Sequence, residues 1–262
     1  MLKHSWARAW HYLTYWLDAV DSHSLHAPFI YSLFTEVIQP QYTLKLESLE
    51  HFLKELYLET DIILVNDLGA GADQDQKPAK RVIGRIAKNS HNPKVAQLLY
   101  RLVQHFNCRK VLELGTNLGL TTMNLAKAAP QGTIATMEGC PNLAERAQKH
   151  FKKFGLKNIK PYVGAIEDML LIAIADLGPP DLVYIDANHR FEPTLRYFET
   201  CIKETHEKSV MVLDDIHWSR EMSKAWGQIK EDPRVRISVD LYHVGLLFFD
   251  SKFAKKHYIL EF

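Results

Sequence analysis

Three aspartates at the ends of two apolar runs are the side chains of this sequence best placed to do chemistry. Asp186 ends the run at 181–186, Asp214 ends the run at 209–214, and Asp215 follows it. If the two runs are neighbouring parallel strands, their carboxyl ends meet at one edge of a sheet and the carboxylates converge. Converging carboxylates repel one another, so a divalent cation such as Mg²⁺ or Ca²⁺ is their natural occupant. The alternative is a set of hydrogen-bonding aspartates without a metal.

A second group of residues forms a glycine-containing loop between an apolar run at 111–114 and a helix-compatible stretch at 119–129. Glycines let the backbone approach a ligand closely, and a helix N-terminus offers N–H groups to it. A dinucleotide site would read G-x-G-x-x-G, with a middle glycine that admits the pyrophosphate. This loop reads G-x-x-x-G and has Asn117 at the middle position. The pattern therefore favours a ligand without phosphates.

Two glutamates flank this loop in sequence. Glu138 ends the apolar run at 133–138, about 20 residues beyond the loop, where an acid commonly binds ribose hydroxyls. Glu113 stands just before the loop, where its carboxylate can face the ligand. Thr121 is expected to cap the helix start and to reach a carboxylate of the ligand.

The ordered set Glu-Leu-Gly-Thr-Asn-Leu-Gly, followed by Glu138, resembles the class I S-adenosylmethionine-dependent methyltransferases over roughly residues 93–250. Its G-x-x-x-G form is similar to the catechol and caffeoyl-CoA O-methyltransferase branch. The resemblance implies transfer of a methyl group to a small-molecule acceptor, with oxygen as the favoured atom. It also implies a set of residues that bind S-adenosylmethionine: Glu113, Gly115, Thr116, Gly119, Thr121, Glu138, Ala165 and Ile166.

The resemblance extends to the aspartates. The metal-dependent members carry Asp on the fourth strand and Asp-Asn on the fifth, whereas this chain has Asp215 at the Asn position. Three positions after the fourth-strand Asp those enzymes have a lysine, and this chain has His189. A neutral imidazole can act as a general base near pH 7. Asp186 and His189 are therefore the predicted catalytic residues, and Asp186, Asp214 and Asp215 are the predicted metal ligands.

Composition sets the broad class. The chain has 262 residues, a hydrophobic content of 47% and a net charge of +1, so no overall field points to nucleic acid or a membrane as partner. Its three cysteines lack metal-site spacing, which fits a reducing compartment. The sequence has no apolar run as long as a membrane span and no apolar segment typical of a signal peptide. A cytoplasmic enzyme is the prediction.

From residue 110 onward strands and helices alternate, which predicts an α/β fold. We expect a Rossmann-like, seven-stranded, mostly parallel sheet with an antiparallel terminal hairpin. Only Leu241 to His243 join the last two strands, and so short a connection requires antiparallel pairing. The predicted strands are 110–114, 133–138, 159–163, 181–186, 209–214, 235–240 and 244–250. The predicted helices of this part are 119–129, 141–154, 167–176, 192–205 and 220–230.

Residues 1–90 are predicted to form a helical extension to a methyltransferase domain at 91–262. Trp6, Trp10, Leu13 and Leu17 recur at helical spacing, and this stripe is expected to pack on the domain or on a second subunit of a homodimer. Further helices are expected at 28–38, 44–58, 82–90 and 93–106, with a β-prone run at 62–65.

Asp67-Leu-Gly-Ala-Gly71 also resembles a methyltransferase glycine loop, but a polar stretch follows it and not a helix. Residues 66–80 are therefore predicted to be a mobile loop near the site. Two other functions stay open for the chain as a whole. One is a nicotinamide oxidoreductase, which the G-x-x-x-G loop and the terminal hairpin disfavour. The other is a non-catalytic module that binds a partner through its aromatic N-terminal helix.

Overall fold

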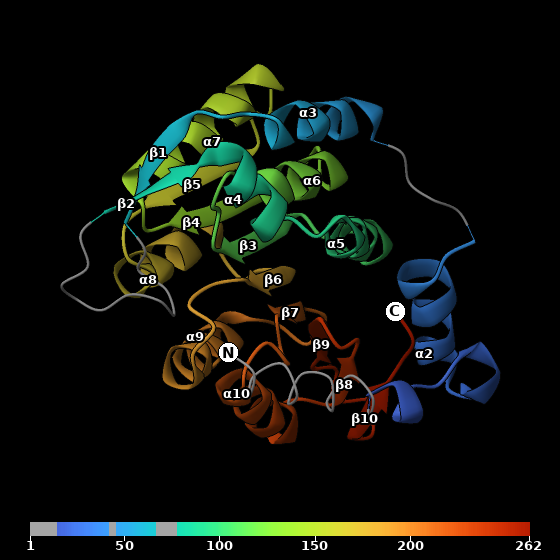
Figure 1. Cartoon of the computed structure of the whole chain (residues 1–262). Helices are drawn as coiled ribbons and strands as arrows, with labels where there is room; N and C mark the ends of the chain where they lie inside the picture. Colours follow the sequence, from blue (N-terminus) through green and yellow to red (C-terminus); the bar gives the residue numbers. More distant parts are fainter. Residues whose placement is uncertain (1–14, 42–45, 67–77) are drawn as a thin grey trace. The chain divides into compact units, whose positions relative to one another are not determined.

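The computed structural model describes residues 15–41, 46–66 and 78–262 (Figure 1). The chain divides into two compact units. One comprises Gln41–Gly178, and the other combines Met1–Pro40 with Pro179–Phe262. Within the described ranges, none of the helices has both the length and the apolar character needed to cross a bilayer.

The main sheet has eight strands in the order β10-β8-β9-β7-β6-β3-β4-β5. Most of its strands are buried apolar runs, as expected for a sheet with both faces covered. β6 and β7 are parallel, whereas β9 is antiparallel to both β7 and β8. The strands are β3 (Lys110–Leu114), β4 (Thr133–Glu138), β5 (Ile159–Val163), β6 (Leu182–Ile185), β7 (Val210–Asp214), β8 (Ile237–Asp240), β9 (Val244–Phe248) and β10 (Lys256–Ile259).

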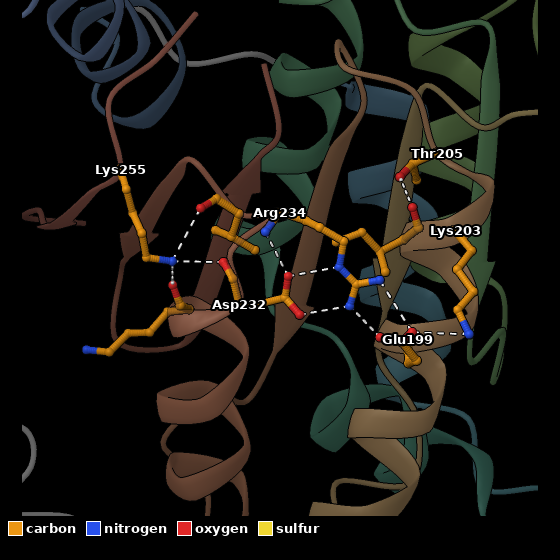
Figure 2. Close-up of polar contacts among 9 residues, drawn as sticks. Glu199, Lys203, Thr205, Asp232, Arg234 and Lys255 are labelled. Carbon is orange, nitrogen blue, oxygen red and sulfur yellow. Dashed lines mark hydrogen bonds and ion pairs between the residues drawn. The ribbon is translucent and has the colours of Figure 1, made fainter. Parts of the chain in front are cut away.

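The predicted fold class and terminal hairpin are confirmed, and the C-terminal tail adds an eighth strand. β10 runs parallel to β8 at the edge of the sheet, where its half-exposed residues need no continuous apolar pattern. The ammonium of Lys255 fixes the start of this strand by donating to the carbonyls of Lys230 (3.0 Å), Asp232 (2.8 Å) and Val235 (3.4 Å) (Figure 2). The tail therefore completes the carboxyl-terminal part of the sheet.

A second polar contact fixes the same corner of the unit. Arg234 bonds to the carboxylate of Asp232 and to that of Glu199 on the neighbouring helix (Figure 2). Lys203, four residues after Glu199, pairs with the same glutamate at 3.1 Å. Arg234, Glu199 and Lys203 are exposed, so the pairs that they form stabilise the fold only slightly.

The Gln41–Gly178 unit packs its helices around β3, β4 and β5. Asn92 caps α5 through its side chain, and a proline occupies the first position of both α5 and α7, as helix starts favour. The helices are α3 (Glu47–Tyr57), α4 (Ile83–Ser90), α5 (Pro93–His105), α6 (Leu120–Ala128), α7 (Pro141–Lys153) and α8 (Ile166–Leu177).

This unit also contains a hairpin that the sequence only half predicts. β1 (Ile62–Val65) pairs antiparallel with β2 (Ala79–Val82) beside α7 (Figure 1). The last part of the segment predicted as a loop, 66–80, is therefore a strand, because its backbone pairs with the β-prone run before it. Asp67–Gly71 lies outside the described residues.

The other unit carries the remaining helices: η1 (Ser22–Ser24), α2 (Pro28–Ser32), η2 (Leu33–Ile38), α9 (Phe191–Glu204) and α10 (Arg220–Glu231). The helix predicted over 28–38 is continuous but changes from α to π geometry at Leu33. Of the predicted aromatic stripe, Trp6, Trp10 and Leu13 lie outside the described residues, and Leu17 is exposed.

Candidate functional site

The loop after β3 is bent by three residues in the left-handed region. Gly115 has φ 105°, Asn117 has φ 50° and Gly119 has φ 77°. The amides of Gly115 and Thr116 both donate to the carbonyl of Met137 on β4, at 3.1 and 2.9 Å. The first turn of the loop is thereby fixed to the neighbouring strand.

Gly119 is needed for a second reason, the close approach of α7. A Cβ at this position would lie 2.7 Å from Cζ of Phe151 and 3.1 Å from Cβ of Ala147. Gly119 is also the N-cap of α6, and no side chain caps that helix. The prediction that Thr121 caps it is therefore wrong, because the chain enters the helix through the left-handed glycine. Thr121 lies in the first turn and is half-buried.

Glu113 points into the unit and not toward an exposed surface. Its side chain is completely buried and accepts hydrogen bonds from the hydroxyls of Thr122 and Thr136, the latter at 2.7 Å. Thr136 in turn lies 2.6 Å from the hydroxyl of Thr116 in the loop. The carboxylate therefore organises the hydroxyls behind the loop, and a direct contact of Glu113 with a ligand stays a prediction.

Glu138, at the end of β4, is half-buried and has an ordered carboxylate. One oxygen accepts from the amide of Asn117 at 2.7 Å, and the other accepts from the amide of Cys140 at 2.8 Å. These two bonds join the glycine loop to the turn before α7. A carboxylate offers about four acceptor positions, so two amide bonds do not exhaust its capacity to bind hydroxyl groups.

Ala165 and Ile166 lie at the end of the next strand. Ala165 is the N-cap of α8, Ile166 is its first residue, and both are half-buried. The preceding Gly164 donates its amide to the carbonyl of Glu138 at 3.0 Å. The structure thus brings the eight predicted cofactor residues to the carboxyl ends of three adjacent parallel strands in one unit.

The predicted catalytic and metal-binding residues belong to the other unit. Nε2 of His189 lies 3.4 Å from Oδ1 of Asp186, and the hydroxyl of Tyr184 donates to Asp214 at 2.9 Å. Burial raises the pKa of Asp214 well above its usual value, and the charges of Asp186 and Asp215 raise it further. The three carboxylates are therefore close enough to repel one another.

His189 supplies positive charge to this group. Burial by itself would lower the pKa of His189, but the hydrogen bond and charge of Asp186, with the charges of Asp215 and Asp214, raise it to about 9. The imidazole therefore carries a proton at neutral pH. This state differs from the neutral imidazole expected from the sequence, because the sequence does not reveal how closely the carboxylates surround it.

The backbone around these acids is strained. His189 has φ 43°, Asp215 has φ 53° and Tyr242 has φ 66°, in a region that residues other than glycine rarely adopt, although Asp and His enter it more often than Tyr does. Such strain persists only where the surroundings impose it, and it is concentrated at functional sites.

The fit of a metal to these acids is incomplete. Three carboxylates are the hard oxygen donors that Mg²⁺ prefers. In the described part of the chain, however, no three His, Cys, Asp or Glu side chains converge as a metal centre requires. Asp186 is instead paired with the His189 cation. The donor chemistry suits a divalent cation, but the arrangement does not present a ready set of ligands.

Asp240, at the end of β8, is a site residue that the sequence analysis missed. Its buried carboxylate accepts from His217 Nε2 at 2.7 Å, from Trp226 Nε1 at 2.9 Å and from the amide of Tyr242 at 2.9 Å. His217 follows Asp215 in the same loop, so this network anchors the loop that carries the acids. The sequence could have indicated Asp240, because it is an acidic residue at the end of a predicted strand.

Comparisons with known proteins are consistent with this geometry. Residues 112–216 match the family described as "Methyltransferase domain". A catechol O-methyltransferase from Mycobacterium tuberculosis is 34% identical over 50% of this chain and 58% of its own length. Another from Niastella koreensis is 29% identical over 65% of this chain and 73% of its own length. The match thus spans little more than half of the mycobacterial relative.

Solved structures extend the comparison to the fold. The cofactor-bound Rv0187 from MTB has a TM-score of 0.55 at 26% identity, covering 61% of this chain and 81% of its own. An O-methyltransferase from Bacillus cereus in complex with SAH has a TM-score of 0.57 at 18% identity, covering 84% of this chain and 97% of its own. The likeness to the second structure concerns the fold alone. Together the matches confirm the predicted resemblance, which the family model places at residues 112–216.

Proposed function

We propose that this chain, through its methyltransferase domain, transfers the methyl group of S-adenosylmethionine to a hydroxyl oxygen of a small-molecule acceptor. The observation that carries the proposal is the carboxylate of Glu138. It ends β4, is half-buried, and is held by the amides of Asn117 and Cys140. A carboxylate fixed in this way can accept two hydrogen bonds from the neighbouring hydroxyls of a ribose.

The remaining cofactor contacts follow from the same strand ends. The N-terminus of α6 has no side-chain cap, and its N–H groups suit the carboxylate of the cofactor. The half-buried Ala165 and Ile166 offer backbone and apolar contacts to the adenine. Both roles are proposals for these positions, as is the role of Thr121 in the first turn of α6.

The acceptor that we propose to test first is a catechol, because both curated relatives described above are catechol O-methyltransferases. Methyl transfer is an in-line displacement at the sulfonium, so the enzyme mainly has to align the acceptor oxygen with the methyl group. The acceptor hydroxyl must also lose its proton. The protonated His189 can stabilise the resulting oxyanion, and it becomes a base only when it has given up its own proton.

A divalent cation on Asp186, Asp214 and Asp215 is the finer part of the proposal. When bound, such an ion would lower the pKa of the acceptor hydroxyl. It would also compete with His189 for Asp186, to which the imidazole is paired. If the ion is required, EDTA abolishes turnover and Mg²⁺ restores it. Full activity in EDTA would leave His189 as the cation of this group.

The experiment for the proposed function is an assay of S-adenosylhomocysteine release from S-adenosylmethionine with catechol. We expect release that depends on catechol and that stops in the Asp186→Ala variant. Tight binding of NADH, with no binding of S-adenosylhomocysteine, would favour the oxidoreductase. Binding of S-adenosylhomocysteine without turnover on any hydroxylated acceptor would favour the non-catalytic module. The boundary at residues 90 and 91 and a homodimer through the N-terminal helices stay predictions.

A further inference from the structure

We propose that His150 is a positioning residue for the cofactor loop, because its imidazole holds the carbonyl of Leu118 in the middle of that loop. The inference rests on the proposed function, since it assigns a role toward the cofactor of that function. It adds a residue outside the predicted site, on the helix that packs behind it.

The central contact is a hydrogen bond between buried partners. Nδ1 of His150 lies 2.9 Å from the carbonyl oxygen of Leu118, and only 4% of His150 and 1% of Leu118 are exposed. Leu118 stands between Asn117, whose amide binds Glu138, and Gly119, the N-cap of α6. A shift of this carbonyl would therefore move both residues that shape the loop.

The partners of His150 determine its tautomer. A carbonyl can only accept, so Nδ1 must carry a proton. On the other side of the ring, Nε of Arg146 lies 3.2 Å from Nε2, and a guanidinium can only donate. Nε2 must therefore be unprotonated. Both contacts require the same state, a neutral imidazole with its proton on Nδ1.

The electrostatic surroundings favour the same neutral state. Burial lowers the pKa of His150, the carbonyl of Leu118 opposes that shift, and the charges of Arg146 and Lys153 add to it. From α3, Glu55 lies 3.6 Å from the ammonium of Lys153. A proton on Nε2 would point at the guanidinium of Arg146 and break the contact between them.

Arg146 is itself fixed from the segment that follows α3. Its Nη2 bonds to both carboxylate oxygens of Glu59, at 2.6 Å for Oε2, and both side chains are largely buried. The ring of Phe52 packs edge-on against His150 with centroids 4.9 Å apart. A continuous series of contacts thus runs from Glu59 through Arg146 and His150 to Leu118. It links the predicted N-terminal extension to the cofactor loop.

α7 holds the loop at a neighbouring point as well. Phe151, the residue after His150, occupies the space that a Cβ on Gly119 would need. One residue therefore supplies packing and the other supplies a directional bond. The peptide after Leu118 is thereby held at both ends, because the amide of Gly119 donates to the carbonyl of Thr116 at 2.8 Å and the carbonyl of Leu118 is held by His150.

The first test compares a substitution that keeps the hydrogen-bond donor with one that keeps the side-chain volume. In His150→Asn the amide nitrogen can occupy the place of Nδ1 and still donate to Leu118, whereas His150→Leu keeps the volume without a donor. By calorimetry we expect S-adenosylhomocysteine to bind His150→Leu about tenfold or more weakly, and His150→Asn within about threefold of the wild type. Glu145→Ala, an exposed change on the same helix, is the matched control and should not alter binding.

The second test needs no buried substitution and uses pH. Because burial and the nearby cations lower the pKa of His150, wild-type affinity should fall only when the pH drops below the usual histidine range, where protonated His150 repels Arg146. In His150→Asn this acid-side loss should disappear. Equal affinities for the wild type and His150→Leu, or an unchanged pH profile in His150→Asn, would overturn the role of His150 alone. Absence of S-adenosylhomocysteine binding to the wild type would instead overturn the proposed function.

Discussion

The acids of the predicted cofactor site and those of the predicted metal site differ in how their charge is balanced. In Gln41–Gly178, the carboxylates of Glu113 and Glu138 are each met by donors, two hydroxyls in one case and two backbone amides in the other. In the other unit, Asp186, Asp214 and Asp215 repel one another, and burial adds to the cost of the charge on Asp214. Glu113 and Glu138 are therefore held by hydrogen-bond donors before a ligand binds. The three aspartates keep an unfavourable electrostatic repulsion.

Backbone conformation shows the same contrast. The described residues with positive φ in the first unit are glycines and asparagines, such as Gly119 and Asn117, which adopt this conformation at little energetic cost. The positive-φ positions of the other unit include Asn188, but also His189, Asp215 and Tyr242, of which Tyr242 is the least suited to this conformation. Preorganisation suits the binding of an invariant cofactor, whereas stored strain and unbalanced charge are typical of sites that perform chemistry.

The largest expected effect comes from filling the space at Gly119. Gly119→Ala combines a positive φ with a Cβ that would lie 2.7 Å from a ring carbon of Phe151. We expect a loss of about 3 kcal/mol in stability, measured by urea unfolding. Gly155→Ala is the matched control, since Gly155 also has positive φ but no atom within 4 Å of the added Cβ. It should cost only about 1 kcal/mol. Equal losses would show that α7 does not constrain the loop.

Asp240 offers the next largest effect. Burial raises its pKa, but the hydrogen bond and charge of His217, with the donors of Tyr242 and Trp226, lower it below its usual value. The ionised Asp240 carboxylate therefore stabilises the folded state at pH values above its unfolded-state pKa of about 3.9. This stabilisation is lost as the pH falls through the pKa of Asp240 in the folded state.

We accordingly expect Asp240→Asn to be about 2 kcal/mol less stable than the wild type at pH 7. The difference should narrow below about pH 4. The exposed change Glu192→Gln serves as control and should follow the wild-type curve. A constant difference at all pH values would mean that the charge of Asp240 is not what stabilises its loop.

The smallest expected change in stability is a gain, where most substitutions cause a loss. Asp214→Asn removes a repelling charge and retains an oxygen to accept from Tyr184, so we expect it to stabilise its unit by about 1 kcal/mol at pH 8. The same carboxylate-to-amide change in the first unit, Glu138→Gln, should destabilise the protein. The glutamine side chain has one oxygen, whereas the two oxygens of Glu138 accept from the backbone N–H groups of Asn117 and Cys140. Thermal melting checks both signs, and destabilisation by both variants would remove the contrast between the units.

Much of the fold was predictable because buried strands carry strong local signals. The runs ending at Leu114, Glu138 and Asp214 are apolar and are bounded by glycines, prolines or charged residues, and each is a strand in the structure. Alternation with amphipathic helices then predicted the sheet, and the short Leu241 to His243 connection predicted the antiparallel hairpin. The positions of Glu138 and of the loop glycines followed from the same pattern.

Other features depend on contacts between residues distant in the sequence. The inward orientation of Glu113 is set by Thr122 and Thr136, and the state of His189 is set by acids from two strands. β10 forms on the edge offered by β8, and its own residues have little strand signal. In the sequence, His150 is one of several polar residues of a helix. Only the structure shows that Leu118 and Arg146 contact its two ring nitrogens.

The central claim is that Glu138 and the glycine loop form the cofactor site, and calorimetry with S-adenosylhomocysteine tests it most directly. Glu138→Ala would lose two charge-assisted hydrogen bonds to the ribose, so we predict binding about 30-fold or more weaker than that of the wild type. Glu145→Ala, seven residues further along and largely exposed, should bind as the wild type does. Wild-type affinity in Glu138→Ala would contradict the account.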